Sequence, residues 1–309
     1  MAFYGKVGGE WQELSNFETY KSFSLVACDT DTEVKKIVED GSGEAWTFSN
    51  HTNTVSDIVL NEDEEAFTAS TDGTIRKIDQ NGQEVWQFDP GTSQNFASVA
   101  TGPNGYVYSG DADGILRKIS ADGTTEVWTF AAAGNVNGID VDQSGYIYIA
   151  AGDAVQKVNP EGTKVWDFLG HTRPINGIRV GDDGAVYTAA FGSNGEAKKI
   201  KPNGQEEWFF DSFGSTANDV AVNETTGEVY VVAGGELRKF DDKGNQQFEY
   251  TTITGTMNTA AVDKNGLLYV GDNNNNLYKL EDTGSGFNQV FTFQGFTGSI
   301  QGNDVIITT

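Results

Sequence analysis

The chain has 309 residues, of which 45 are Asp or Glu and 20 are Lys or Arg, so its formal net charge is −25. A charge of this size and sign argues strongly against nucleic-acid backbones and anionic membrane surfaces as partners. The sequence contains no run of 18 apolar residues and no secretory signal at its start, so we expect no membrane insertion.

The first 20 residues do not share the pattern of the rest, and we expect residues 1–20 to form an N-terminal segment and 21–309 one further domain. Tyr4, Val7 and Trp11 flank a Gly-Gly pair, which predicts a short hairpin. This Val-Gly-Gly-x-Trp hairpin resembles the N-terminal attachment segments of structural proteins of tailed viruses. The resemblance implies attachment through these three residues. The alternative is that the hairpin caps the outer edge of the neighbouring domain.

From residue 22 onward the sequence repeats at intervals of about 40 residues, and an aromatic residue marks each copy. The seven markers are Trp46, Trp86, Trp128, Trp166, Trp208, Phe248 and Phe291. Each copy contains four short runs in which β-branched and aromatic residues alternate with polar ones, bounded by Gly, Asn, Asp or Pro. Such a unit is typical of a four-stranded propeller blade. The sequence therefore predicts an all-β, seven-bladed β-propeller of antiparallel blades.

A lysine recurs in the third strand of each copy, at Lys36, Lys77, Lys118, Lys157, Lys199, Lys239 and Lys279. Its presence in all seven copies predicts a structural role, in which the ammonium group lies near a carboxylate or over an aromatic ring.

The two ends of the repeat region predict how the ring closes. The first copy begins at Phe23 with a second strand, while the segment 303–309 at the end is similar to the first strands that begin at Asn176 and Asn218. Because an open edge strand promotes aggregation, we expect the C-terminal strand to complete the N-terminal blade. The asparagines that open these innermost strands are expected to line one mouth of the central channel: Asn137, Asn176, Asn218, Asn258 and Asn303.

Residues 79–88, Asp-Gln-Asn-Gly-Gln-Glu-Val-Trp-Gln-Phe, resemble the repeat of the pyrroloquinoline-quinone (PQQ)-like propellers, and the resemblance extends over residues 22–309. Quinone-dependent enzymes of that family carry a pair of adjacent cysteines and calcium ligands, whereas this chain has the single Cys28. We therefore expect no cofactor and no enzymatic activity. Gly170-His171-Thr172 resembles the opening of a WD40 blade, and His51-Thr52 is its counterpart.

The loops that join the fourth strand of one copy to the first strand of the next are longer and more varied than the acidic turns on the opposite face. Variable loops on a rigid scaffold typically carry recognition residues. We expect these loops to form a binding face, with some side chains filling the channel mouth instead. Its candidate residues are His51, Phe96, His171, Arg173, Phe213, Met257 and Phe296. The two histidines lie three copies apart, so neither a shared metal site nor a catalytic group is predicted.

The abundance of acids over lysines is typical of proteins from extreme halophiles, because about 1 M salt shortens the Debye length to about 3 Å and screens self-repulsion. A protein that is merely acidic is the alternative. Together with the hairpin, this composition predicts a multicopy virion component of a halophilic archaeal virus, either capsid-surface decoration or a tail-fibre or receptor-binding part. Its expected partners are other virion proteins, through the N-terminal segment, and a host-surface protein or glycan, through the loop face. A cytoplasmic haloarchaeal scaffold and a PQQ-like enzyme are the alternatives.

Overall fold

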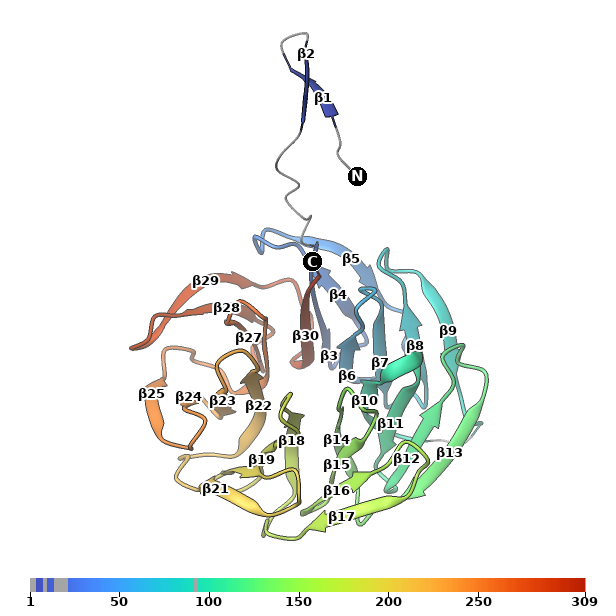
Figure 1. Ribbon diagram of the computed structural model, residues 1–309, viewed down its shortest axis with the longest axis vertical. Helices are drawn as coiled ribbons and strands as arrows, with labels where there is room; N and C mark the ends of the chain where they lie inside the picture. The colour runs from blue at the N-terminus through green and yellow to red at the C-terminus, as the bar shows by residue number, and fades with distance from the viewer. Residues whose placement is uncertain (1–3, 8–9, 14–21, 92–93, 309) are drawn as a thin grey trace.

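The computed structural model describes residues 4–7, 10–13, 22–91 and 94–308. Over these residues the protein contains seven four-stranded antiparallel sheets arranged in a ring, and one separate two-stranded sheet (Figure 1). Within the described ranges the helical structure is limited to a single 3-10 turn, η1 (Pro103–Gly105). The predicted seven-bladed propeller is confirmed.

We number the blades in ring order and name their strands from the central channel outward. Blade 1 contains β30 (Ile300–Thr308), β3 (Ser22–Asp29), β4 (Val34–Ile37) and β5 (Glu44–Phe48). Blade 2 contains β6 (Val55–Leu60), β7 (Ala66–Ser70), β8 (Ile75–Ile78) and β9 (Glu84–Phe88). Blade 3 contains β10 (Phe96–Thr101), β11 (Val107–Asp111), β12 (Ile115–Ile119) and β13 (Glu126–Ala131). Blade 4 contains β14 (Val136–Val141), β15 (Ile147–Ala151), β16 (Ala154–Val158) and β17 (Lys164–Phe168).

The remaining three blades repeat the same order. Blade 5 contains β18 (Ile175–Val180), β19 (Val186–Ala190), β20 (Glu196–Ile200) and β21 (Glu206–Phe210). Blade 6 contains β22 (Ala217–Asn223), β23 (Glu228–Ala233), β24 (Glu236–Phe240) and β25 (Gln246–Tyr250). Blade 7 contains β26 (Met257–Val262), β27 (Leu267–Asp272), β28 (Leu277–Asp282) and β29 (Phe287–Phe293). The separate sheet pairs β1 (Tyr4–Val7) with β2 (Glu10–Glu13), as the hairpin prediction requires.

The C-terminal strand completes the first blade, as predicted. β30 pairs antiparallel with β3, from Ser22 opposite Thr308 to Asp29 opposite Ile300. One detail of the prediction is wrong. The pairing skips Gln301, so Gln301, and not Asn303, occupies the position that Asn176 and Asn218 hold in their strands.

The core lies between neighbouring blades, because each sheet buries both of its faces. The second strands β7, β11, β15 and β19 are buried at every position, whereas the outermost strands alternate exposed and half-buried residues. Among the largest fully buried side chains are tyrosines of second strands, including Tyr108, Tyr148 and Tyr230. In the outermost strands, the half-buried residues lie on the side that faces the next blade, and the exposed residues lie on the other side.

The five marker tryptophans join blades at the outer rim. Each indole Nε1 donates to a backbone carbonyl in the next blade: Trp46 to Gln80 at 3.0 Å, Trp86 to Ala121 at 3.2 Å, Trp128 to Pro160 at 3.1 Å, Trp166 to Pro202 at 3.1 Å and Trp208 to Asp242 at 3.2 Å. Each ring also lies against a turn glycine. At Gly82, whose φ is +81°, an added Cβ would lie 2.8 Å from Trp46. Phenylalanine at the last two markers has no N–H to donate, so the junctions after blades 6 and 7 lack this bond.

The recurrent third-strand lysines have the structural role predicted for them. Lys36 Nζ lies 3.0 Å from Glu64 Oε2. Lys118 Nζ and Lys157 Nζ lie 4.0 Å and 4.4 Å from the ring centroids of tyrosines in their own blades. These lysines thus stabilise their blades through contacts with a carboxylate or with an aromatic ring.

Candidate functional site

Most of the residues predicted for the loop face are buried. The fractional exposures are 3% for His51, 0% for Phe96, 4% for His171, 0% for Phe213, 0% for Met257 and 5% for Phe296. The prediction that these side chains form an exposed surface is therefore wrong for six of the seven candidates. Only Arg173 is exposed. Tyr4, Val7 and Trp11 belong to the β1–β2 pair, and their role in attachment stays a prediction.

The burial has a simple cause, which is the constant distance from the innermost strand. His51, His171, Phe213 and Phe296 each stand four residues before such a strand begins. There the side chain turns inward onto the last aromatic residue of the preceding strand. The ring centroids are 5.9 Å apart for Phe48 and His51, 5.9 Å for Phe168 and His171, 4.9 Å for Phe210 and Phe213, and 5.7 Å for Phe293 and Phe296. Phe96 and Met257 are themselves the first residues of innermost strands, a fully buried position.

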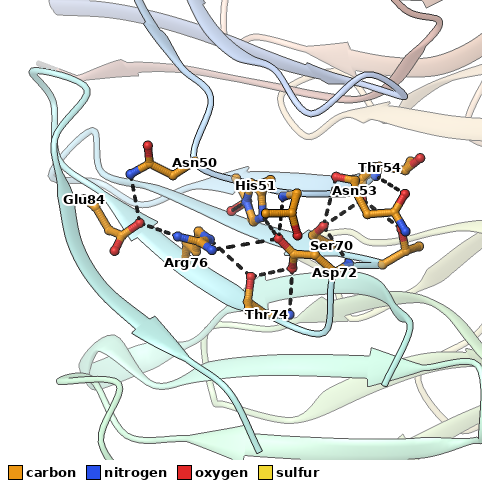
Figure 2. A network of polar contacts seen from close by, with 12 residues as sticks. Asn50, His51, Asn53, Thr54, Ser70, Asp72, Thr74, Arg76 and Glu84 are labelled. Carbon is orange, nitrogen blue, oxygen red and sulfur yellow. Dashed lines mark hydrogen bonds and ion pairs between the residues drawn. The ribbon is translucent and has the colours of Figure 1, made fainter. Parts of the chain in front are cut away.

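His51 anchors the loop between blades 1 and 2. Its Nδ1 lies 3.1 Å from Asp72 Oδ2, and its Nε2 lies 2.8 Å from Thr68 Oγ1 (Figure 2). Asp72 also accepts from Thr52 N at 3.0 Å and from Thr74 Oγ1 at 2.6 Å. Burial raises the pKa of Asp72, but these hydrogen bonds outweigh burial and hold its pKa well below the usual value. The network ties the loop to the turn between β7 and β8.

The network continues outward from the aspartate. Figure 2 shows Arg76 between Asp72 and Glu84, with Arg76 Nη1 2.6 Å from Glu84 Oε2. Asn50 Nδ2 donates weakly to the same glutamate at 3.4 Å. His51 is therefore fully engaged inside the blade and presents no free nitrogen to a ligand.

His171 anchors the equivalent loop between blades 4 and 5. Its Nδ1 lies 3.0 Å from Glu196 Oε2, and its Nε2 lies 2.9 Å from Thr188 Oγ1. Thr172 Oγ1 donates to the other oxygen of Glu196 at 3.0 Å. Burial lowers the pKa of His171 to about 4, although the nearby Glu196 carboxylate raises it, so the ring is neutral at physiological pH. Both histidines therefore hold loops in place.

The two anchored loops, 49–54 and 169–174, make the same backbone contacts. Thr71 N donates to Thr54 O at 3.0 Å in the first, and Phe191 N donates to Pro174 O at 2.8 Å in the second. Gly192 packs under Arg173, since an added Cβ there would lie 2.7 Å from Arg173 Cδ. Because these backbone hydrogen bonds match, residues at equivalent positions in the two loops can be compared directly.

Their outward-facing residues differ. The first loop and its neighbouring turn carry Ser49, Asn53, Thr54 and Thr71, and the second carry Leu169, Arg173, Pro174 and Phe191. Leu169 is 74% exposed and Phe191 52% exposed. We call Leu169, Arg173, Pro174 and Phe191 the apolar loop patch.

Arg173 also differs from the other arginines. Each of the other four lies within ion-pair distance of a carboxylate: Arg76 and Glu84 at 2.6 Å, Arg117 and Asp111, Arg179 and Asp219 at 3.9 Å, and Arg238 and Glu236 at 2.8 Å. Among the described residues, no carboxylate pairs with Arg173. In a chain with 45 acidic residues, this guanidinium is left open to solvent.

The central channel is a second candidate site. A cavity of about 650 Å³ opens where the innermost strands end, and its lining includes Asp57, Asp140, Asp304 and Arg179. These groups were not predicted from the sequence. In the part of the chain that the structure describes, no three His, Cys, Asp or Glu side chains are grouped to hold a metal ion.

The asparagines at the opposite mouth serve packing. Their Nδ2 atoms donate to the first backbone carbonyl of the next innermost strand: Asn137 to Ile175 at 3.0 Å, Asn176 to Ala217 at 3.1 Å, Asn218 to Met257 at 2.7 Å and Asn258 to Ile300 at 3.0 Å. Asn303 instead donates to Tyr269 O at 3.1 Å, consistent with its different register.

Two sequence families match the chain. Residues 71–179 and 151–294 match the family described as "Outer membrane protein assembly factor BamB", a PQQ-like repeat family. Together these segments run from residue 71 to residue 294, more than half of the chain. The chain belongs to this family of PQQ-like propellers. Residues 43–79 match the family described as "WD domain, G-beta repeat", and this segment contains His51 and Asp72. No relative is found among proteins with curated descriptions.

A propeller of the PQQ-like and WD40-like type is a general scaffold for protein interaction. Over the described residues, no helix is long and apolar enough to cross a membrane. Sequence reasoning named Arg173 but missed Leu169 and Phe191. Comparison of the two histidine-containing loops position by position would have found both, because Ser49 and Thr71 are their counterparts.

Proposed function

We propose that this propeller binds a protein partner through the apolar loop patch. The observation that carries the proposal is the contrast between two equivalent, histidine-anchored loops. Loop 49–54 presents small polar side chains, whereas loop 169–174 presents Leu169 and Arg173, and the exposed Phe191 is bonded through its backbone to Pro174 of this loop. Exposed aromatic and arginine side chains on a rigid support are the groups that contribute most to protein interfaces.

The partner that fits this patch is a protein segment with a carboxylate next to an apolar side chain. Arg173 has a free guanidinium for the carboxylate, and Leu169, Pro174 and Phe191 provide the apolar surface. The remaining surface of a chain with net charge −25 repels such a segment. Repulsion elsewhere and attraction at Arg173 together would orient the partner on one side of the ring.

The matched experiment exchanges the patch for its own counterpart. The triple variant Leu169→Ser, Arg173→Asn, Phe191→Thr copies the residues of the other loop and keeps His171. The control variant Ser49→Ala, Asn53→Ala, Thr71→Ala changes the equivalent positions of loop 49–54. Short linear peptides displayed on phage serve as the probe for the wild type and both variants.

The proposal predicts that peptides selected on the wild type combine Asp or Glu with an aromatic or aliphatic residue. They should lose binding to the triple variant and keep binding to the control. Peptides without a carboxylate, or equal binding to the triple variant, would overturn the proposal.

The virion assignment stays a prediction, which rests on the N-terminal hairpin and the acidic composition. In that setting the patch would contact a host-surface protein or a neighbouring virion protein, and the β1–β2 pair would attach the propeller to the particle. Co-purification with particles from a halophilic host tests this assignment. Recovery only from the soluble cell fraction would favour the cytoplasmic scaffold, and quinone-dependent turnover by the purified protein would favour the enzyme.

A further inference from the structure

Four carboxylates of the innermost strands each join two neighbouring blades. Asp304 Oδ2 accepts from Leu60 N at 2.7 Å, and Asp57 Oδ2 accepts from Val99 N at 3.0 Å. Asp140 Oδ2 accepts from Val180 N at 2.8 Å, and Asp219 Oδ2 accepts from Ala260 N at 3.0 Å. In all four residues Oδ1 accepts from the next backbone N–H of its own strand. Four of the seven blade junctions are therefore linked by an aspartate at the channel.

Blade 2 is held in this way on both sides. Asp304 links it to the C-terminal strand β30 of blade 1, and Asp57 links it to β10 of blade 3. The Asp304–Leu60 bond therefore joins blade 2 to blade 1, the blade in which the C-terminal strand closes the ring.

Within the described part of the chain, Arg179 is the cation that lies among these four carboxylates. Arg179 Nη1 donates to Ile178 O at 2.8 Å, and its Nη2 lies 3.9 Å from Asp219 Oδ2. Asp140, Asp57 and Asp304 also act on this guanidinium electrostatically. The Arg179 side chain is 37% accessible and lines the channel cavity. Fully ionised, the ring of four aspartates and one arginine carries three excess negative charges.

The groups around the ring add more negative charge. Glu62, Asp182, Glu224 and Asp263 line the same cavity, and among the described residues Lys264 is the one further cation in its lining. Cys28 of β3 is fully buried, and Asp57 acts on its thiol electrostatically. The innermost strands β10 and β26 contribute uncharged residues, including Ser98 and Thr259, at the matching positions.

We propose that the four aspartates and Arg179 form a proton-operated clasp, in which proton uptake by Asp57, Asp140 and Asp304 tightens the blade junctions at the channel and proton release loosens them. A neutral carboxyl group keeps one carbonyl oxygen as acceptor. With the proton on Oδ1, the Oδ2 bond to the next blade therefore remains, while the bond within the strand is weakened. What proton uptake removes is repulsion among carboxylates that burial has partly stripped of water.

The direction of the pH dependence follows from the raised pKa values of three carboxyl groups. Burial raises the pKa of Asp57 to about 7 and that of Asp304 to about 6, and burial also raises the pKa of Asp140. When a junction opens, these groups regain water, and their pKa falls toward about 3.9. The closed ring therefore binds protons more tightly than the opened ring. Closure is favoured at about pH 5 and weakens as the pH rises through 6 to 7.

Amide hydrogen exchange in the full-length protein tests the clasp. The amides of Leu60 and Val99 should be about tenfold better protected at about pH 5.5 than at about pH 8, after correction for intrinsic exchange rates. The Gly82 amide, in the outer turn, should show no such change. The measurement is made in about 1 M salt, where the Debye length of about 3 Å removes the contribution of general surface repulsion.

Two variants separate the clasp from other causes of pH dependence. Asp57→Asn and Asp304→Asn remove the titrating groups, so the change in protection at Val99 and Leu60 should disappear. Should these variants fail to fold, Arg179→Gln keeps all four aspartates and removes the cation. It should shift the loss of protection to higher pH, because the carboxyl groups hold their protons more tightly.

Equal protection at both pH values in the wild type would overturn the clasp, as would an unchanged profile in Asp57→Asn and Asp304→Asn or in Arg179→Gln. The loop patch takes no part in this experiment, so its outcome is independent of partner binding.

Discussion

Loops 49–54 and 169–174 occupy equivalent places three blades apart, and they differ on their surfaces while sharing one anchor. In both, a buried histidine joins a threonine hydroxyl and a carboxylate and packs edge-on against a phenylalanine. Above that anchor, one loop is polar and the other carries Leu169, Arg173 and Pro174. We infer that the shared anchor serves the fold and that the outward-facing residues that differ serve the proposed binding.

The largest effect is expected from opening the closed ring, because the ring supports both loops. Deleting residues 300–309 removes β30, which pairs along the whole of β3 and accepts Leu60 N through Asp304. The exposed edge of β3 should give insoluble protein or a melting curve without a cooperative transition. Solubility and circular dichroism melting measure the effect. An unchanged melting curve would mean that blades hold their loops without closure.

Removing each anchor in turn asks whether the two histidines are equivalent. His51→Ala and His171→Ala each abolish two hydrogen bonds and a ring contact, and remove the ring nitrogen that bonds a buried threonine hydroxyl. Each should lower the free energy of unfolding by about 2–4 kcal/mol, measured by urea denaturation. The exposed Thr172→Ala is the control, with an expected change within about 1 kcal/mol. A loss confined to one histidine would break the equivalence.

Acid should affect the His171 anchor differently from the channel. The pKa of His171 is lowered to about 4 by burial, so the folded loop binds the proton less tightly than the unfolded chain, whose histidines titrate near about 6.5. The stability supplied by this neutral histidine is present above about pH 6.5 and is lost as the pH falls toward 4.

Between about pH 4 and 6.5, proton uptake should stabilise the clasp but destabilise the His171 loop. A global melting temperature therefore mixes the two effects. The ring-proton NMR shift of His171 reads the loop alone and should titrate near pH 4. A midpoint at the ordinary value of about 6.5 would contradict the buried, neutral anchor.

The sequence predicted the features that recur and missed those that occur at irregular positions. The marker series from Trp46 onward predicted seven blades, and the terminal strands predicted closure, because both repeat at a fixed period. The buried state of Phe213 and Phe296 was missed, although both stand at the same offset from an innermost strand as the histidines. A loop position is not necessarily a surface position.

The aspartate links had no periodic pattern to reveal them. Asp57 and Asp219 stand at the third position of their strands, whereas Asp140 and Asp304 stand at the fifth. Both positions face the channel, and only the closure of the ring brings these aspartates close to one another. The last strand was misaligned because Asn303-Asp-Val resembles Asn218-Asp-Val. The residue at the bulge, which recurs at the second position of all seven innermost strands, is Gln301.

The smallest effect on stability should come from the residues that are proposed to bind the partner. Leu169, Arg173 and Phe191 are exposed, so Leu169→Ser, Arg173→Asn and Phe191→Thr should each change the free energy of unfolding by no more than about 0.5 kcal/mol. Urea denaturation of the single variants provides the check. A larger loss would identify the patch as part of the folded core.

Partner binding to the exchanged patch tests the central claim most directly. The measurement is the Kd of a peptide selected on the wild type, determined for the wild type, the triple variant and the control variant of loop 49–54. The account predicts that the triple variant weakens binding by about tenfold or more while the control leaves the Kd unchanged. Equal affinity for all three proteins would contradict it.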